Sequence, residues 1–223
     1  MSFLSLLILS SVKIVSSLFF FFQVKWLKVE GEKWDKVRLV AIINHTSLYE
    51  PIFIAKIPWS FIWRLSRKMV APGADKTLNR PIVGIFWRAL SPGFVPISRK
   101  RDDTWKEFME SIKARSVIVI APEGRMKRPN GLDLKGNKMS IRGGIADILE
   151  QIDDGNMVLA YSGGLHHVQV PGQKIPNLFR KVKLNIEQID IANYKAQFGG
   201  SGRAWKKAVI EDLQFRLENN VPN

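Results

Sequence analysis

The stretch LVAIINHTSLYEP, residues 39–51, joins an unbroken apolar run to a polar segment that carries a histidine and a carboxylate. The apolar part, residues 39–43, is typical of a buried strand. His45 and Glu50 follow it directly, so the pair lies where a strand ends and a new element begins. In open α/β sheets, ligands bind outside the carboxyl ends of the strands. This segment is therefore a candidate site.

The residue types of His45 and Glu50 suit a general base and the carboxylate that orients it. An ideal helix would place residues five positions apart roughly 140° from each other. A hydrogen bond between the two side chains therefore requires the intervening turn to fold the carboxylate back towards the imidazole ring. A second polar segment, Pro122-Glu123-Gly124-Arg125, follows the apolar run 117–120 in the same way. Gly124 suits either an unusual backbone angle or a plain turn.

Further apolar runs alternate with helical patterns along the chain. The expected strands are 38–44, 94–97, 116–121, 157–161, 165–170 and 181–186. The expected helices are one after Pro51, 81–90, one from Thr104 with a capping box completed by Glu107, 141–151 and 201–219. This alternation predicts one α/β domain with a mostly parallel sheet flanked by helices.

Three motifs in order resemble those of the glycerolipid acyltransferase superfamily, whose best-known members acylate lysophosphatidic acid. The first family motif is N-H-x4-D, and here it is Asn44-His45 followed by Glu50. The second, a glycine and mostly apolar residues before an arginine, matches residues 93–99. The third, F-P-E-G-T-R-S, matches residues 121–128 without its threonine. Glu50 in place of aspartate and the missing threonine indicate a divergent subgroup whose acceptor lipid stays open.

The resemblance implies transfer of an acyl group from acyl-CoA or acyl carrier protein to a hydroxyl of a lysophospholipid. It assigns His45 as the general base and Glu50 as its orienting carboxylate, with no covalent acyl-enzyme. It also implies that Arg99 binds the acceptor phosphate, which guanidinium groups hold bidentately, and that Glu123, Gly124 and Arg125 shape the acceptor site. No cofactor and no metal are expected. The candidate residues for an apolar acyl-chain groove are Phe53, Phe61, Trp63, Phe86 and Trp87.

The composition favours anionic partners. The chain has 34 basic and 20 acidic side chains and a formal net charge of +14. The basic residues are spread along the sequence and no recognised nucleic-acid module appears, so we expect membrane lipids and phosphate-bearing substrates as partners, and no nucleic acid. Cysteine is absent, which excludes a disulfide framework and a thiolate nucleophile and fits a cytosolic setting.

Residues Phe3 to Phe22 are almost all apolar or serine, and as a helix they would extend about 30 Å. Lys13 near the middle would cost about 2.5–3.5 kcal/mol inside a bilayer. Lys13 also shares an arc of roughly 140° with several serines. We therefore expect residues 1–23 to form a membrane-associated helix that lies in the interface on the cytoplasmic face, ahead of an acyltransferase domain over residues 24–223. A transmembrane span is the alternative.

Two other functions remain open at this point. One is a non-catalytic basic protein that binds membrane surfaces, in which Glu50 marks a decayed catalytic pair. The chain also contains Ala160-Tyr161-Ser162-Gly163-Gly164, which loosely matches the nucleophile elbow of serine esterases. The order of an esterase triad fails there, because His166 and His167 follow within five residues and are the last histidines.

Overall fold

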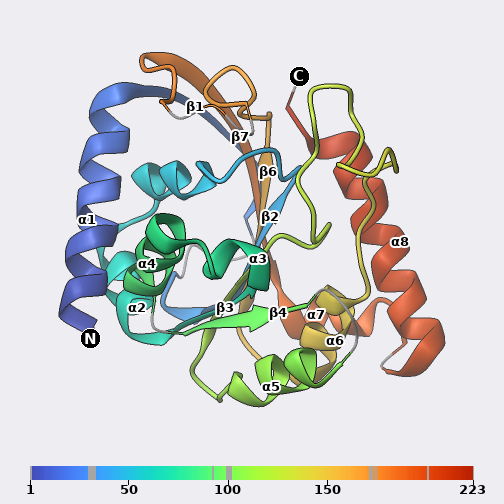
Figure 1. Ribbon diagram of the computed structural model, residues 1–223. Helices are drawn as coiled ribbons and strands as arrows, with labels where there is room; N and C mark the ends of the chain where they lie inside the picture. Colours follow the sequence, from blue (N-terminus) through green and yellow to red (C-terminus); the bar gives the residue numbers. More distant parts are fainter. Residues whose placement is uncertain are drawn as a thin grey trace.

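The computed structural model describes residues 2–29, 34–91, 93–98, 102–170, 173, 175–199 and 201–222. Seven strands form one sheet in the order β1-β7-β6-β2-β5-β3-β4 (Figure 1). The strands are β1 (Phe20–Val29), β2 (Val37–Ile43), β3 (Met69–Ala74), β4 (Phe94–Ile97), β5 (Val117–Ile120), β6 (Asn156–Ser162) and β7 (Arg180–Asp190). The helices are α1 (Ser2–Phe19), α2 (Trp59–Lys68), α3 (Asp75–Leu78), α4 (Pro81–Leu90), α5 (Asp103–Ser111), α6 (Gly144–Gln151), α7 (Ile191–Ala196) and α8 (Gly202–Asn220), with 3-10 helices η1 (Trp34–Lys36) and η2 (Glu50–Lys56).

The sheet is mostly parallel, as the alternation of strands and helices predicted. β6, β2, β5, β3 and β4 run parallel to one another. β7 is antiparallel to β6, and β1 pairs in parallel with β7 at the edge. Because the five parallel strands point the same way, the segments that follow β2 and β5 leave the sheet on the same edge. This topology brings the first and third motifs together.

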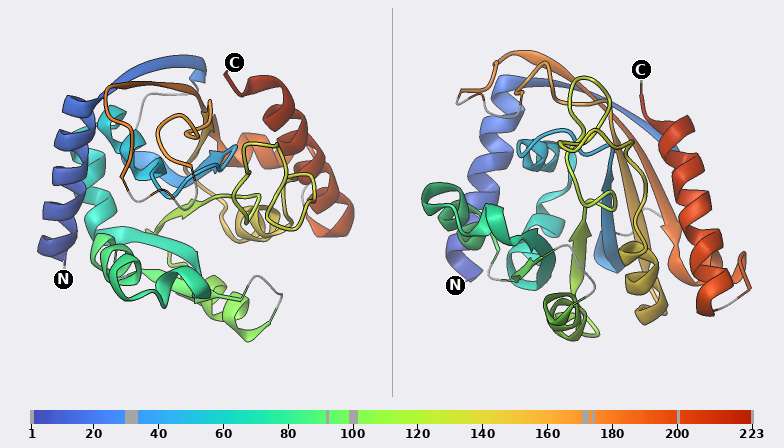
Figure 2. Two further views of the ribbon diagram at one scale, coloured as in Figure 1. Left: turned by 45° about the horizontal axis from the view of Figure 1, so that its top comes forward. Right: turned by 45° about the vertical axis from the view of Figure 1, so that its right-hand side comes forward.

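Helices cover both faces of the sheet, with α1, α2 and α4 on one side and α6 and α8 on the other (Figures 1 and 2). Successive side chains of a strand point to opposite faces. In β2, Leu39, Ala41 and Ile43 are fully buried towards the α6–α8 side. Val40 and Ile42 point to the other side, where they pack against the core beneath α1 and α2. The domain therefore has one hydrophobic core on each face.

A polar network ties α8 to the sheet on the α8 side. Glu187 on β7 accepts hydrogen bonds from Tyr161 Oη at 2.8 Å and from Arg216 Nη1 at 2.7 Å. Arg216 Nε also donates to Asp212 at 2.7 Å, and Asp212 accepts from Tyr194 Oη at 2.7 Å. Burial of the Tyr194 hydroxyl raises its pKa, so this group stays a hydrogen-bond donor.

Several local expectations were wrong. Residues 165–170 form a turn, not a strand, and bury Leu165 and Val168 at a spacing of three. The segment after Pro51 begins as the 3-10 helix η2, and α2 follows only from Trp59. Helix α5 is capped by Asp102, which accepts from the Thr104 N–H, in place of the predicted capping box. Strand β1 was not predicted, because its first residues were assigned to the helix over residues 1–23. Strand β3 was not predicted, because Pro72 and Gly73 disfavour a strand.

The N-terminal helix α1 ends at Phe19, four residues before the predicted end of the helix at residue 23, and Phe20–Val29 continues as β1. Its polar side faces the protein. Ser5 Oγ donates to the Leu90 carbonyl at 2.5 Å, and Lys13 Nζ donates to the carbonyls of Ala55 and Ile57 at 2.8 and 2.7 Å. The outward residues are Phe3, Leu4, Leu7, Ile14, Val15 and Leu18, each at least 48% exposed. The helix thus exposes these apolar side chains, while Ser5, Lys13 and the buried Leu9 face the protein.

Among the residues that the structure describes, no helix is both long enough and apolar enough to cross a membrane.

Candidate active site

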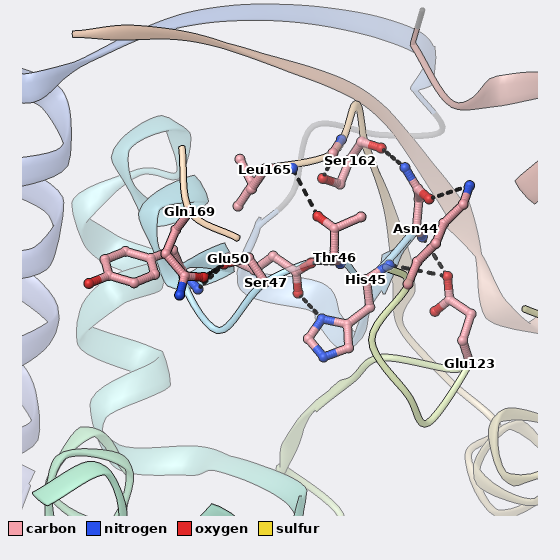
Figure 3. Close-up of polar contacts among 12 residues, drawn as sticks. Asn44, His45, Thr46, Ser47, Glu50, Glu123, Ser162, Leu165 and Gln169 are labelled. Atoms are coloured by element: carbon pink, nitrogen blue, oxygen red, sulfur yellow. Dashed lines mark hydrogen bonds and ion pairs between the residues drawn. The ribbon is translucent and has the colours of Figure 1, made fainter. Parts of the chain in front are cut away.

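The carboxylate of Glu50 folds back onto the His45 ring, as the five-residue spacing required (Figure 3). His45 follows β2, and a turn over residues 44–49 leads into η2, which begins at Glu50. Glu50 Oε2 is hydrogen-bonded to His45 Nδ1, and its Oε1 accepts from the Thr46 N–H at 2.8 Å. Glu50 is only 4% exposed. Both carboxylate oxygens are therefore engaged, which fixes the ring orientation.

Glu123, the residue after Pro122 in the third motif, holds the backbone of the first motif. Its Oε1 accepts from the N–H groups of Asn44 and His45 at 2.6 and 3.3 Å. Glu123 is 2% exposed, and its Oε2 has no hydrogen-bond partner among the described residues. Burial raises the pKa of the Glu123 carboxyl, against the opposing effect of His45 and the Asn44 N–H.

Asn44 forms hydrogen bonds that connect the carboxyl ends of β2, β5 and β6 (Figure 3). Its φ of 64° lies in the left-handed region, which asparagine tolerates better than most residues. Its Nδ2 donates to the carbonyl of Ser162, the last residue of β6, at 2.7 Å, and its Oδ1 accepts from Lys127 Nζ at 3.2 Å. Lys127 also donates its backbone N–H to the His45 carbonyl at 2.7 Å. The segments after β2, β5 and β6 therefore position one histidine.

Gly124 and Arg125 follow Glu123 in the same loop. Gly124 has a φ of 65°, so the turn requires a residue that adopts the left-handed region without strain. Arg125 forms an ion pair with the buried Asp133. The Asp133 carboxylate also accepts the Asn137 N–H at 2.9 Å, and these contacts hold the pKa of Asp133 well below its ordinary value. Arg99, predicted to bind phosphate, lies outside the described residues.

A cavity of about 600 Å³ runs from these residues into the core beneath α1 and α2. His45, Glu50, Glu123, Gly124 and Arg125 all line it. Its apolar walls come from the sheet (Val40, Ile42, Val158, Ala160, Leu184 and Ile186) and from the helices (Leu9, Phe61, Leu65, Trp87 and Leu90). Such a cavity has the size and character of a small-molecule binding site.

Three of the five aromatic residues predicted to line an apolar groove do so, namely Phe53, Phe61 and Trp87. The other two, Trp63 and Phe86, point outward and are 54% and 40% exposed. Helical position alone does not distinguish the two groups, because α2 and α4 carry apolar residues on both their inner and outer sides.

Arg142 is a site residue that sequence reasoning missed. It lines the cavity, and its backbone N–H donates to the Pro122 carbonyl at 2.9 Å, beside the third motif. Its guanidinium forms no ion pair within the described part of the chain. The sequence placed Arg142 inside a helix from residue 141, whereas α6 begins at Gly144. The two glycines after Arg142 were the signal that could have separated it from the helix.

The geometry around Ser162 does not support an esterase. Ser162 is fully buried, and its hydroxyl accepts from the Gly164 N–H at 3.1 Å. His166 Nε2 donates to the Lys127 carbonyl at 2.8 Å, and His167 Nε2 donates to the Lys181 carbonyl at 2.7 Å. Both neighbouring histidines are thus occupied by backbone carbonyls, and neither pairs with the Ser162 hydroxyl.

Comparisons with known proteins show the family and the fold. The profile of the Acyltransferase family matches residues 27–162, more than half of the chain. The fold is similar to the crystal structure of the 1-acyl-sn-glycerophosphate (LPA) acyltransferase PlsC from Thermotoga maritima, with a TM-score of 0.59 and 20% identity over 95% of this chain and 79% of that chain. A comparison with curated proteins found no match. The matched region contains His45, Glu50 and Glu123, and the chain therefore belongs to the Acyltransferase family of enzymes.

Proposed function

We propose that this acyltransferase moves a fatty acyl group from acyl-CoA or acyl carrier protein to a hydroxyl of a phosphate-bearing lysolipid. The observation that carries the proposal is the His45–Glu50 pair, which opens on a largely apolar cavity of about 600 Å³. The similar structure from Thermotoga maritima is named as an enzyme that acts on 1-acyl-sn-glycerophosphate. That name supports a phosphate-bearing lysolipid as the acceptor.

In the proposed reaction His45 acts as the general base. The His45 Nδ1–H donates to Glu50, so a neutral ring takes up the acceptor proton at Nε2 as the hydroxyl oxygen attacks the thioester carbonyl. The carboxylate then stabilises the imidazolium that forms. A C–O bond forms and the C–S bond breaks, and the proton passes from the imidazolium to the departing thiolate. No acyl-enzyme is needed.

The acceptor phosphate requires cationic ligands near this base. Arg142 lines the cavity beside the third motif. Arg125 is oriented by Asp133, so its guanidinium is already ordered before a substrate binds. The family resemblance alone assigns Arg99 to binding of the acceptor phosphate. The contacts of Glu123 lead us to assign it a positioning role at the backbone of His45, in addition to its place in the wall of the acceptor site.

We place the acyl chain in the apolar part of the cavity. Removing each methylene from water contributes about 0.8 kcal/mol, so a long chain gains substantially from the walls formed by the sheet and by α1, α2 and α4. The enzyme would work at the cytoplasmic face of a membrane, with the outward apolar residues of α1 in the lipid interface and the net charge of +14 attracting anionic lipids.

The test is transfer of labelled acyl groups from acyl-CoA and from acyl carrier protein to a panel of lysolipids. His45→Ala should abolish product. His167→Ala is the matched control, because the ring of this exposed histidine donates to the Lys181 carbonyl, away from the His45–Glu50 pair, and its loss should leave activity unchanged. Full activity in His45→Ala would contradict the assigned base. Absence of product from wild-type protein with every donor and acceptor would refute the proposed reaction.

A further inference from the structure

Helix α4 presents an apolar stripe outward. Ile82, Ile85, Phe86 and Ala89 recur at positions i, i+3, i+4 and i+7, the spacing of one helix face. In a globular protein this face normally packs against the core. Here Ile82 is 84% exposed and Ile85 is 69% exposed. These two isoleucines are among the most exposed large apolar side chains of the described residues.

The opposite side of α4 is firmly seated, so the exposure does not come from a loosely attached helix. Gly84 packs against α3 so closely that a Cβ there would lie 2.0 Å from the Leu78 carbonyl oxygen. Leu90 is buried, and Trp87 lines the cavity. A helix that is apolar on both sides requires an apolar environment on both sides.

Helix α4 contacts the N-terminal part of α1, whose outward residues are also apolar. The Ser5 hydroxyl donates to the Leu90 carbonyl, which joins the first turn of α1 to the last turn of α4. Phe3, Leu4 and Leu7 lie in the same part of α1 and are also exposed. Both helices cover the same face of the sheet (Figure 2). Apolar side chains of both helices are thus exposed on this surface of the molecule, and exposed apolar surface of this kind marks an interaction site.

Cationic residues flank this surface. Lys76, Arg80 and Arg88 are exposed on α3, before α4 and on α4, and Asp75 is the one acidic residue between positions 75 and 91. Basic residues beside an exposed apolar helix face match the combination of lipid tails and anionic headgroups. A second protein copy would have to bury these cations against a like-charged surface, since the chain carries a net charge of +14.

We propose that α4 inserts into an anionic lipid bilayer through Ile82, Ile85 and Phe86, as a second contact beside α1. The inner sides of the same two helices wall the cavity, through Leu9 of α1 and Trp87 and Leu90 of α4. The bilayer therefore lies directly over the cavity. This inference concerns membrane contact alone and stands whether or not the site catalyses acyl transfer.

The chain contains no cysteine, so a single introduced cysteine reports one position without background. Full-length Ile85→Cys, labelled with an environment-sensitive nitrobenzoxadiazole dye, is mixed with vesicles of phosphatidylglycerol and phosphatidylcholine. The expected result is a blue shift with higher intensity, as the dye enters an apolar phase. Phe215→Cys is the matched control, because Phe215 is 63% exposed on α8, across the sheet from α4 (Figure 1). Its label should not respond.

A second experiment measures vesicle binding of Ile82→Asp/Ile85→Asp against Phe215→Asp by co-sedimentation. Loss of two inserted side chains should weaken partitioning by roughly tenfold or more, with the control unchanged. Binding at high salt should persist in wild-type protein, because apolar insertion is not screened. The proposal is overturned by an unresponsive Ile85 label, by equal binding of the two variants, or by a label response that depends on protein concentration without lipid, which would indicate a second copy.

Discussion

Replacing Glu50 with glutamine tests the central contact of the site. The carboxylate uses both oxygens as acceptors, one for the Thr46 N–H at 2.8 Å and one for His45 Nδ1. Glutamine supplies one acceptor oxygen and one donor NH2 group. Whichever way the amide turns, one of the two partners faces a donor, and the side chain is too buried for water to compensate.

Each orientation of the amide has a distinct consequence. If the amide oxygen faces His45, the Thr46 N–H loses its acceptor, which costs about 1–3 kcal/mol of folding free energy. If the NH2 group faces His45, the ring must carry its proton on Nε2 and no longer acts as a base. The imidazolium loses its carboxylate in both cases. We therefore expect kcat to fall by roughly 10² to 10⁴ with little change in KM.

The assay is steady-state acyl transfer to a lysolipid, run with Glu50→Gln and Glu50→Asp beside wild type. The aspartate keeps the charge but is one methylene shorter, so with the backbone of η2 in place it should retain one of the two contacts and an intermediate rate. Thermal unfolding defines a temperature at which all three proteins are folded. Near-normal kcat in Glu50→Gln would remove Glu50 from the mechanism, and a large rise in KM alone would reassign it to substrate binding.

Three further changes test other parts of the structure. Because burial raises the pKa of Glu123, the wild-type protein should lose stability relative to Glu123→Gln as the pH rises above 4.5 through the folded-state pKa. Urea unfolding over this range measures the difference, and a pH-independent difference would contradict the assignment. Ala160→Phe fills part of the cavity and should shift kcat/KM towards shorter acyl donors; an unchanged preference would place the acyl chain elsewhere. Arg216→Ala leaves the buried Glu187 without its cation and should cost about 2–3 kcal/mol, less than a fully buried pair because the guanidinium is partly exposed. Thermal unfolding checks this value, and an unchanged midpoint would show that the pair does not hold α8.

The sequence predicted the centre of the fold well. β2, β5 and β6 are built on the short apolar runs 39–43, 117–120 and 157–161, each followed within a few residues by polar side chains, and such strands are buried on both faces of a parallel sheet. The positions of His45 and Glu123 at strand ends followed from the same pattern. The hydrogen bond from the His45 N–H to Glu123 could not be predicted from the sequence, because it depends on β2 and β5 being neighbours in the sheet.

Predictions from the local sequence pattern were wrong where the structure of a segment depends on residues far away in the sequence. The first residues of β1, 20–22, continue the apolar run of α1, and pairing with β7 makes Phe20–Val29 a strand. Residues 165–170 were predicted as a strand, but Thr46 Oγ1 accepts the Leu165 N–H at 2.8 Å and helps to hold this segment as a turn. Arg142 lies beside Glu123 in the cavity wall because its backbone bonds to Pro122, which no local pattern records.

By itself, the sequence determined the mostly parallel α/β architecture, the His45–Glu50 pair and the family, because strand runs and motif spacing are local properties of the chain. The tertiary structure alone decided which way the helices face. α1 turns Ser5 and Lys13 inward because the backbone carbonyls of Leu90, Ala55 and Ile57 accept their hydrogen bonds. α4 turns Ile82 and Ile85 outward because Gly84 and Leu90 fit the interior. Amphipathic spacing shows that a helix has two faces, and only its neighbours decide which face is buried.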